Sequence, residues 1–288
     1  MGEVVTAIAI MTGLGLFCAA VLALAYRFLR VEEDPRLEAV EELLPGNNCG
    51  ACGQPGCAAF AEKLLVAEVT PGKCTVADSG TLEEIASVLG VDVGAEEKRI
   101  ARLKCAGGPG NVRNLAEYRG MSSCRAAAVV DGGGLGCAWG CLGLGDCERA
   151  CTFDAIHMNA DSLPSVDPEP CTACGDCVDV CPQDLFVLVP ESQKLFVQCN
   201  SPLTGEAALR GCRVACDACG RCAADAPAGT VEMLGGLPIV HYDRGELPGP
   251  EATWRCPTGA ITWIEHEQFP EAEAEDEDAD ARPWRSYG

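Results

Sequence analysis

Four cysteines in one short stretch of the sequence have the spacing of an iron-sulfur cluster motif. The run CTACGDCVDVCP, from Cys171 to Pro182, follows the pattern C-x2-C-x2-C-x3-C-P, in which three thiolates wrap one [4Fe-4S] cubane and the fourth ligates a second cubane. Zinc sites use pairs of cysteines, so three cysteines at two-residue gaps favour iron. The motif therefore predicts four cluster ligands: Cys171, Cys174, Cys177 and Cys181.

A second group of cysteines lies just upstream, at looser gaps. Because the fourth cysteine of each run ligates the other cluster, we predict two crossed ligand sets. One set is Cys171, Cys174, Cys177 and Cys151, and the other is Cys137, Cys141, Cys147 and Cys181. The upstream motif has Thr152 in place of the usual proline. Together the two sets predict a two-cluster domain.

A third motif is incomplete. In CDACGRCAADAP, Ala226 stands where a fourth cysteine is expected before Pro227. A later Cys-Pro pair can supply the missing ligand, so we predict one cubane held by Cys216, Cys219, Cys222 and Cys256. Ala226 and the cysteine-free segment 242–253 together account for the four ligands of one lost cluster.

A further group of four cysteines precedes these motifs in the pattern C-x2-C-x4-C-x16-C. Neighbouring glycines allow tight turns that direct backbone amides at cluster sulfurs. We predict a [4Fe-4S] site here, with a four-cysteine zinc site as the alternative. Its ligands are Cys49, Cys52, Cys57 and Cys74.

Five of the 21 cysteines remain after these assignments. Cys18 lies in an apolar segment and is most simply a small apolar residue. The other four are as many as one more cubane needs, although no local spacing supports a site. A fifth cluster and buried or free thiols are therefore both open for Cys105, Cys124, Cys199 and Cys212.

The choice between metal sites and disulfides depends on the compartment. Val4–Tyr26 carries no charge and is long enough to span a membrane, which favours a retained anchor over a cleaved signal peptide. Arg27 and Arg30 follow this segment and no basic residue precedes it, so the positive-inside rule places the rest of the chain in the cytoplasm. Thiols stay reduced there, and disulfides are the minority interpretation.

The charge distribution and the remaining motifs exclude several other functions. A net charge of −22 argues against nucleic-acid binding. Part of this charge lies in the C-terminal tail 265–288, whose acidic composition is typical of disordered ends. No G-x-G-x-x-G opens a helix after a strand, so we expect no flavin or NAD site in this chain. Spacing also singles out no catalytic arrangement around the three histidines.

The helices and strands expected around these cysteines indicate an α+β fold. Apolar spacing predicts a helix that follows a short linker after residue 30 and ends before Pro45. It predicts further helices in AAFAEKLLVAEV, TLEEIASVLG and AEEKRIARLKC, and a short strand is predicted in AAAVV. CTFDAIHM, CPQDLFVL, APAGTVEM and CPTGAITW are four copies of one turn-and-strand unit. The expected organisation is a transmembrane helix, a small helical Fe-S domain and tandem ferredoxin-like βαβ domains: 1–30 anchor, 31–100 helical 4Fe-4S domain, 101–136 Gly-rich connector, 137–200 two-cluster ferredoxin domain, 201–264 one-cluster ferredoxin domain and 265–288 acidic tail.

The combination of an N-terminal anchor, a C-x2-C-x4-C-x16-C domain and ferredoxin repeats resembles the B subunit of the Rnf electron-transport complex. The stretches that carry the resemblance are LLPGNNCGACGQPGC, GCLGLGDC, CNSPLTG and CRVACDACGRC, which are similar to the longer form found in anaerobes. The resemblance implies an electron-carrier subunit of an ion-translocating ferredoxin:NAD oxidoreductase, with no bond chemistry of its own. It also implies soluble ferredoxin and the other complex subunits as partners.

The same residues allow other functions. A membrane-tethered polyferredoxin that donates to another reductase would have the same sequence features. A redox-sensing or cluster-storage protein is a further alternative, and it predicts exposed, labile clusters.

Overall fold

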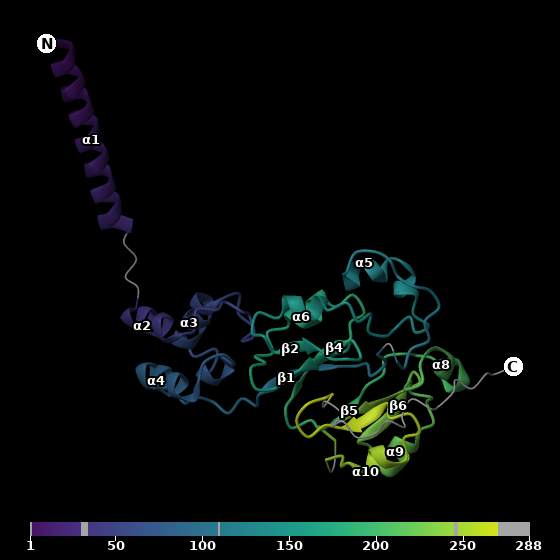
Figure 1. The fold of residues 1–288 in the computed structure, drawn as a ribbon. Coiled ribbons are helices and arrows are strands. Elements are labelled where there is room, and N and C mark those ends of the chain that lie inside the picture. Colours follow the sequence, from purple (N-terminus) through teal and green to yellow (C-terminus); the bar gives the residue numbers. More distant parts are fainter. Residues whose placement is uncertain (1, 30–33, 109, 245–246, 270–288) are drawn as a thin grey trace. The chain divides into compact units, whose positions relative to one another are not determined.

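The computed structural model describes residues 2–29, 34–108, 110–244 and 247–269 (Figure 1). The chain divides into two compact units. The first contains 1–48, 54–71 and 77–93, and the second contains 49–53, 72–76 and 94–288. The acidic tail predicted to be disordered lies, from residue 270 onward, outside the described residues.

The first unit begins with one long apolar helix, α1 (Gly2–Leu29). Within it, Ile8–Phe28 is a 21-residue stretch with a mean hydropathy of 2.4 and no buried share. By length and composition this stretch is sufficient to cross a bilayer, which needs about 20 apolar residues.

Three shorter helices build the core of the first unit: α2 (Pro35–Leu43), α3 (Cys57–Leu65) and α4 (Ser79–Leu89). Asp34 and Asp78 cap α2 and α4, each accepting a hydrogen bond from a first-turn backbone N–H. Both α3 and α4 pack on α2. The core is formed by Val40, Phe60, Leu64 and Ile85. The three predicted helices of this region are confirmed.

Two secondary-structure predictions are wrong. AEEKRIARLKC was expected to be a helix, but Arg99–Leu103 forms strand β1, which belongs to the second unit. Its last four residues are consecutively buried, a pattern that covers both faces of a strand. AAAVV was expected to be a strand, but Cys124–Ala128 forms helix α5, whose N-terminus is fixed by a side chain from elsewhere in the chain.

The second unit repeats one order of elements twice. The first half runs β1, α6 (Asp146–Ala150), β2 (Ile156–Met158), β3 (Pro164–Val166), α7 (Asp176–Val180) and β4 (Phe186–Pro190). The second half runs β5 (Leu195–Val197), α9 (Arg221–Asp225), β6 (Val231–Leu234), β7 (Leu237–Val240), α10 (Glu251–Trp254) and β8 (Ile261–Trp263). The four turn-and-strand copies predicted from sequence are β2, β4, β6 and β8, so the internal repeat is confirmed.

Strand pairing also repeats. The first and last strands of each half pair with each other, and the two middle strands form a hairpin. In the part of the chain that the structure describes, these are four two-stranded sheets, all antiparallel. The βαβ description is therefore wrong, since a βαβ unit has parallel strands. In each half the buried core instead draws residues from the outer strand pair, the hairpin and the two one-turn helices.

The segments between the repeated elements carry the remaining short helices of the second unit. They are α5 and the 3-10 helix η2 (Asp131–Gly134) in the first half and α8 (Gly205–Gly211) in the second. Another 3-10 helix, η1, spans Pro71–Lys73. Isolated bridges join Val112 to Cys212 and Asn114 to Leu135, so the connector of the first half contacts the end of α8.

Candidate iron-sulfur sites

The best-defined site lies in the first half of the second unit. Its hollow has about 320 Å³ of empty space, and the four thiols of one predicted crossed set line it: Cys151, Cys171, Cys174 and Cys177. Cys177 is carried by α7, and Cys151 follows α6. Burial raises the pKa of the Cys177 thiol, and the neighbouring Cys171 and Cys174 thiolates raise it further. The Cys177 thiol therefore favours its anionic form only when a cation such as cluster iron is bound.

The second hollow of this half is lined by a different set of cysteines from the predicted one. A hollow of about 360 Å³ is lined by Cys124, Cys141, Cys147 and Cys181. The sequence predicted Cys137 in this set and grouped Cys124 with the cysteines outside the motifs. Burial raises the pKa of the Cys147 thiol to about 12, with Cys124 and Cys181 among the thiolates that add to it. Cys124 thus takes the place predicted for Cys137.

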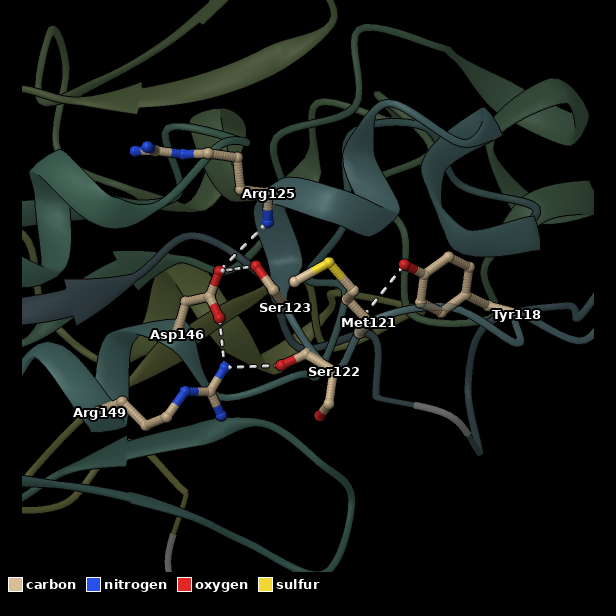
Figure 2. A network of polar contacts seen from close by, with 7 residues as sticks. All are labelled: Tyr118, Met121, Ser122, Ser123, Arg125, Asp146 and Arg149. Carbon is tan, nitrogen blue, oxygen red and sulfur yellow. Dashed lines mark hydrogen bonds and ion pairs between the residues drawn. The ribbon is translucent and has the colours of Figure 1, made fainter.

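A polar network holds Cys124 against the helix that carries Cys147 (Figure 2). The Asp146 carboxylate, at the start of α6, accepts hydrogen bonds from Ser123 Oγ at 3.0 Å and from the Arg125 backbone N–H at 3.2 Å. Arg149 pairs with the other oxygen of Asp146 and donates to the Ser122 carbonyl at 3.0 Å. Burial acts to raise the pKa of Asp146, but these hydrogen bonds bring it below its ordinary value.

One sequence signal distinguishes Cys124 from Cys137. The glycine before each cysteine-bearing helix recurs in GDC (145–147), GDC (175–177) and GRC (220–222), and it adopts a left-handed conformation each time. Aligning these triplets matches Cys141 to the first cysteine of the other two motifs and Leu144 to the second. The motif is therefore missing its second cysteine, and only a residue outside it can replace that ligand.

A hollow of this kind also lies in the second half of the unit. It has about 310 Å³ of empty space and is lined by Cys216, Cys219, Cys222 and Cys256. Burial acts to raise the pKa of Cys256, but backbone N–H groups of Ile261, Thr258 and Ala260 bring it below the ordinary thiol value. Amides directed at a sulfur stabilise its anionic form.

Apolar side chains occupy the region where this half lacks ligands. Helix α10 corresponds in order to α7 and contains no cysteine. Ala226, Val240 and Tyr242 pack against the core cluster that contains buried Ala252, and the Tyr242 hydroxyl donates to the Leu195 carbonyl at 2.7 Å. A packed core with one satisfied hydroxyl therefore stands in the second half where the first half has a thiol-lined hollow.

The cysteines of the N-terminal motif are half-buried and are divided between the two units. Cys57 begins α3 in the first unit, whereas Cys49, Cys52 and Cys74 belong to segments grouped with the second. Locally, Asn48 Oδ1 accepts the Cys57 backbone N–H at 2.8 Å. In the second unit, the Thr75 hydroxyl donates to the Thr172 carbonyl at 2.6 Å, which places the residue after Cys74 beside the residue after Cys171.

The remaining thiols do not group as the sequence suggested. Cys105, Cys199 and Cys212 lie together with Cys137 rather than with Cys124. All 21 cysteines are free thiols. Among the described residues, no three or more His, Cys, Asp or Glu side chains converge on a single metal ion. Each thiolate of a cubane binds a different iron atom, so its four ligands need not converge on a single ion.

The thiol sets fit a [4Fe-4S] group by their donor chemistry. Each hollow in the second unit is lined by four cysteine thiols. Two of the sets combine three thiols of one motif with one from a distant segment, whereas the Cys124 set combines two thiols of one motif with two from other segments. Thiolate is the ligand that such clusters take.

Comparisons with known proteins match two of the cysteine-containing regions and most of the chain. Residues 44–76 match FeS, an Fe-S cluster family, and residues 164–186 match the 4Fe-4S binding domain. The B subunit of the ion-translocating oxidoreductase complex of Methanosarcina acetivorans is 34% identical over 89% of this chain and 97% of its own length. Its counterpart in the proton-translocating ferredoxin:NAD(+) oxidoreductase complex of Clostridium ljungdahlii is 34% identical over 92% and 94%. The counterpart in the Na(+)-translocating ferredoxin:NAD(+) oxidoreductase complex of Acetobacterium woodii is 39% identical over 75% of this chain and 65% of its own length.

Proposed function

Because this chain belongs to the family of B subunits of Rnf-type ion-translocating oxidoreductase complexes and is an iron-sulfur electron-transfer subunit of that family, we propose that it relays single electrons between at least four [4Fe-4S] cubanes. The observation that carries the proposal is the set of three hollows in the second unit, each lined by four thiols. The fourth cubane is assigned to the N-terminal motif, which the Fe-S cluster family match supports. The thiols that hold these four are Cys151, Cys171, Cys174 and Cys177; Cys124, Cys141, Cys147 and Cys181; Cys216, Cys219, Cys222 and Cys256; and Cys49, Cys52, Cys57 and Cys74.

The chain's own residues bind the clusters and set their environment. A bound cubane supplies a one-electron redox couple, whose potential depends on hydrogen bonds, charge and exposure. The crossed ligand sets tie neighbouring sites to the same helices, since α6 carries Cys147 and leads into Cys151, and α7 carries Cys177 and leads into Cys181. Helices α6 and α7 pack on each other. Short separations between sites therefore follow from the backbone itself.

The partners and location follow from the family and the first helix. We assign α1 as a single membrane anchor, with the cluster domains on the cytoplasmic side because Arg27 lies in the last turn of α1, at the C-terminal end of the apolar stretch. Soluble ferredoxin is the proposed electron donor, and the other subunits of the complex are the proposed acceptors and neighbours. The related proteins of A. woodii and C. ljungdahlii are named for different ions; for this chain we propose only that the complex moves a cation.

Reductive titration of the full chain in detergent, without oxygen, tests the proposal. A reduced acidic bacterial ferredoxin is added stepwise, and the bleaching of the visible cluster absorbance is followed by stopped flow. At least four electrons per chain should be accepted in a fast phase. Slow, incomplete reduction accompanied by loss of iron would instead favour the redox-sensing alternative and would contradict a relay.

A further inference from the structure

Four thiols that belong to no local motif converge between the two halves of the second unit. They come from three separate parts of the chain: Cys105 after β1, Cys137 after η2, and the pair Cys199 and Cys212 on either side of α8. Cys105 and Cys212 are buried, at 7% and 5% exposed. Cys137 and Cys199 pack against the core that contains Cys212, together with Val112, Ala208 and Ala215.

Electrostatic interactions link these four thiols. The pKa of Cys212 is raised to about 12, chiefly by burial, with contributions from the thiolates of Cys105, Cys137 and Cys199. The pKa of Cys105 is raised to about 11, again chiefly by burial, with contributions from Cys137 and Cys199. Burial raises the pKa of Cys137, and the Cys199 thiolate acts in the same direction. Together with the core that Cys137, Cys199 and Cys212 share, these interactions place the four thiols in one region.

The backbone around Cys105 is arranged to receive an anionic sulfur. The N–H groups of Gly107 and Cys141 donate to Cys105 Sγ at 3.4 and 3.3 Å. A Cβ placed on Gly107 would lie 2.9 Å from Cys212 Sγ and 3.7 Å from Cys105 Sγ. Glycine at this position is what allows the chain to pass so close to two sulfurs. Backbone N–H groups directed at cluster sulfurs are a recurring feature of iron-sulfur sites.

The competing interpretation is that these are four ordinary buried thiols. A single buried cysteine behaves as a small apolar residue. Four such residues, drawn from three segments into one region, gain nothing from that role that alanine or valine could not supply. All four remain unpaired thiols, so disulfide bonding does not explain their convergence either.

We propose that Cys105, Cys137, Cys199 and Cys212 hold a fifth [4Fe-4S] cluster that connects the two ferredoxin halves. This inference rests on the proposed electron relay. It replaces Cys124 of the sequence-based set by Cys137.

The neighbours of this site lie on both sides of it. On one side, the backbone of Cys141, a thiol of the Cys124 site, donates directly to Cys105 Sγ. On the other side, the Cys199 thiolate is among the charges that raise the pKa of Cys216, after burial, to about 11. Hydrogen bonds from Ala106 N to the Gln198 carbonyl and from Gln198 N to the Ala260 carbonyl join the three backbones. An electron exchanged between the halves leaves one cubane and enters the next, with no bond made or broken.

Iron and acid-labile sulfide in paired cysteine variants of the full chain, purified without oxygen, test the ligand set. Cys137→Ala and Cys199→Ala should each perturb one cluster, and the same one, so the double variant should lose about four irons in total. Cys124→Ala and Cys199→Ala should perturb different clusters, and their iron losses should add. Cys18→Ala, in the apolar helix, is the control that should change nothing.

The opposite pattern would overturn the assignment. Additive losses for Cys137 and Cys199, with non-additive losses for Cys124 and Cys199, would restore the sequence-based grouping. Unchanged iron in both Cys137→Ala and Cys199→Ala would mean that no fifth cluster exists, while about sixteen irons in the wild type would leave the four-cluster relay intact. Wild-type protein without iron would instead contradict the proposed function itself.

Electron paramagnetic resonance tests the connecting role separately. In the reduced wild type, spin coupling between neighbouring cubanes should broaden the signal of the C-terminal site. In the Cys137→Ala/Cys199→Ala double variant, that signal should become magnetically isolated. An unchanged coupled spectrum in the double variant would show that the two halves communicate without this site.

Discussion

Asp146 accepts a hydrogen bond from the Ser123 hydroxyl at 3.0 Å, and this contact joins the residue before Cys124 to the residue before Cys147 (Figure 2). The two cysteines line the same hollow although 22 residues separate them in the sequence. The carboxylate also receives the Arg125 N–H and thereby caps α5. Asp146 is therefore a positioning residue for a ligand that its own motif lacks.

Replacing Asp146 with alanine should loosen Cys124 and make its cluster labile. Loss of the cap alone should cost about 1 kcal/mol, and mild chelation should remove about four irons faster than in the wild type. Asp179→Ala, on the corresponding helix α7, is the matched control. Equal rates of iron release in the two variants would contradict the positioning role.

The same contact predicts a pH dependence. The hydrogen bonds hold the folded-state pKa of Asp146 below its ordinary value, so its contribution to stability is complete above the unfolded-state pKa of about 3.9. It is lost as the pH falls from there through the folded-state pKa. Comparing Asp146→Asn with the wild type by hydrogen exchange at α5, at pH 7 and at pH 5.5, should show the same difference at both values, because both lie above the unfolded-state pKa and the clusters survive there. A difference that already shrinks at pH 5.5 would contradict the lowered pKa.

Arg102 is a buried cation beside one cluster site. It is 3% exposed, and its Nη2 donates to the His266 carbonyl at 3.1 Å. Among the described residues, the Nε and Nη1 atoms of Arg102 have no hydrogen-bond partner. Burial lowers the pKa of Arg102, whereas Glu191 and the Cys171 thiolate act to raise it. Arg102→Met should lower the reduction potential of the Cys171 cluster by on the order of tens of millivolts, because a nearby positive charge favours the added electron.

A matched variant on the same strand controls for the loss of an arginine. Arg99 is exposed and donates to the Leu188 carbonyl, so Arg99→Met should leave the potential unchanged within the same redox titration. A shift of the same size in both variants, or a rise in potential in Arg102→Met, would refute the electrostatic role of Arg102.

Asn48 should support the N-terminal site through α3. Its side chain accepts the Cys57 N–H at 2.8 Å and therefore supplies the cap that Gly56 lacks. Asn48→Ala should destabilise this helix start by about 1 kcal/mol and reduce iron retention, whereas exposed Asn47→Ala should not. Measuring iron after gel filtration with a weak chelator compares the two, and equal retention would count against the cap.

The packed core that replaces a cluster in the second half should tolerate no added metal. Ala226→Cys restores only one of the four missing ligands, so its iron content should equal that of the wild type. Tyr242→Phe, which removes the hydroxyl bonded to Leu195, should lower stability by about 1 kcal/mol without changing iron. Additional iron in Ala226→Cys would show that a metal site survives there.

Much of the fold follows from the sequence because its repeats are local. The four turn-and-strand copies and the helices from Pro35 to Leu89 depend on apolar spacing and on capping residues beside them. The helix prediction for Arg99–Leu103 failed because this segment is a strand that pairs with β4, which lies far away in the sequence. Likewise, α5 depends on the distant Asp146 carboxylate.

The sequence-based grouping of Cys124 and Cys137 differs from the structure for the same reason, which is dependence on contacts between distant segments. Cys137 stands four residues before Cys141 and looks like part of its motif, but the ligand sets are decided by three-dimensional folding of the connector. The recurring glycine–x–cysteine triplets contain the corrective signal, since they align Leu144 with a ligand position. The positioning roles of Asp146 and Arg102 have no such signal, because they arise only from contacts between distant segments.

Iron, acid-labile sulfide and zinc per full-length chain, purified without oxygen, test the central claim most directly. Five cubanes predict about twenty irons with as many sulfides and no stoichiometric zinc. Stoichiometric zinc with little iron or sulfide would contradict an electron relay through this chain.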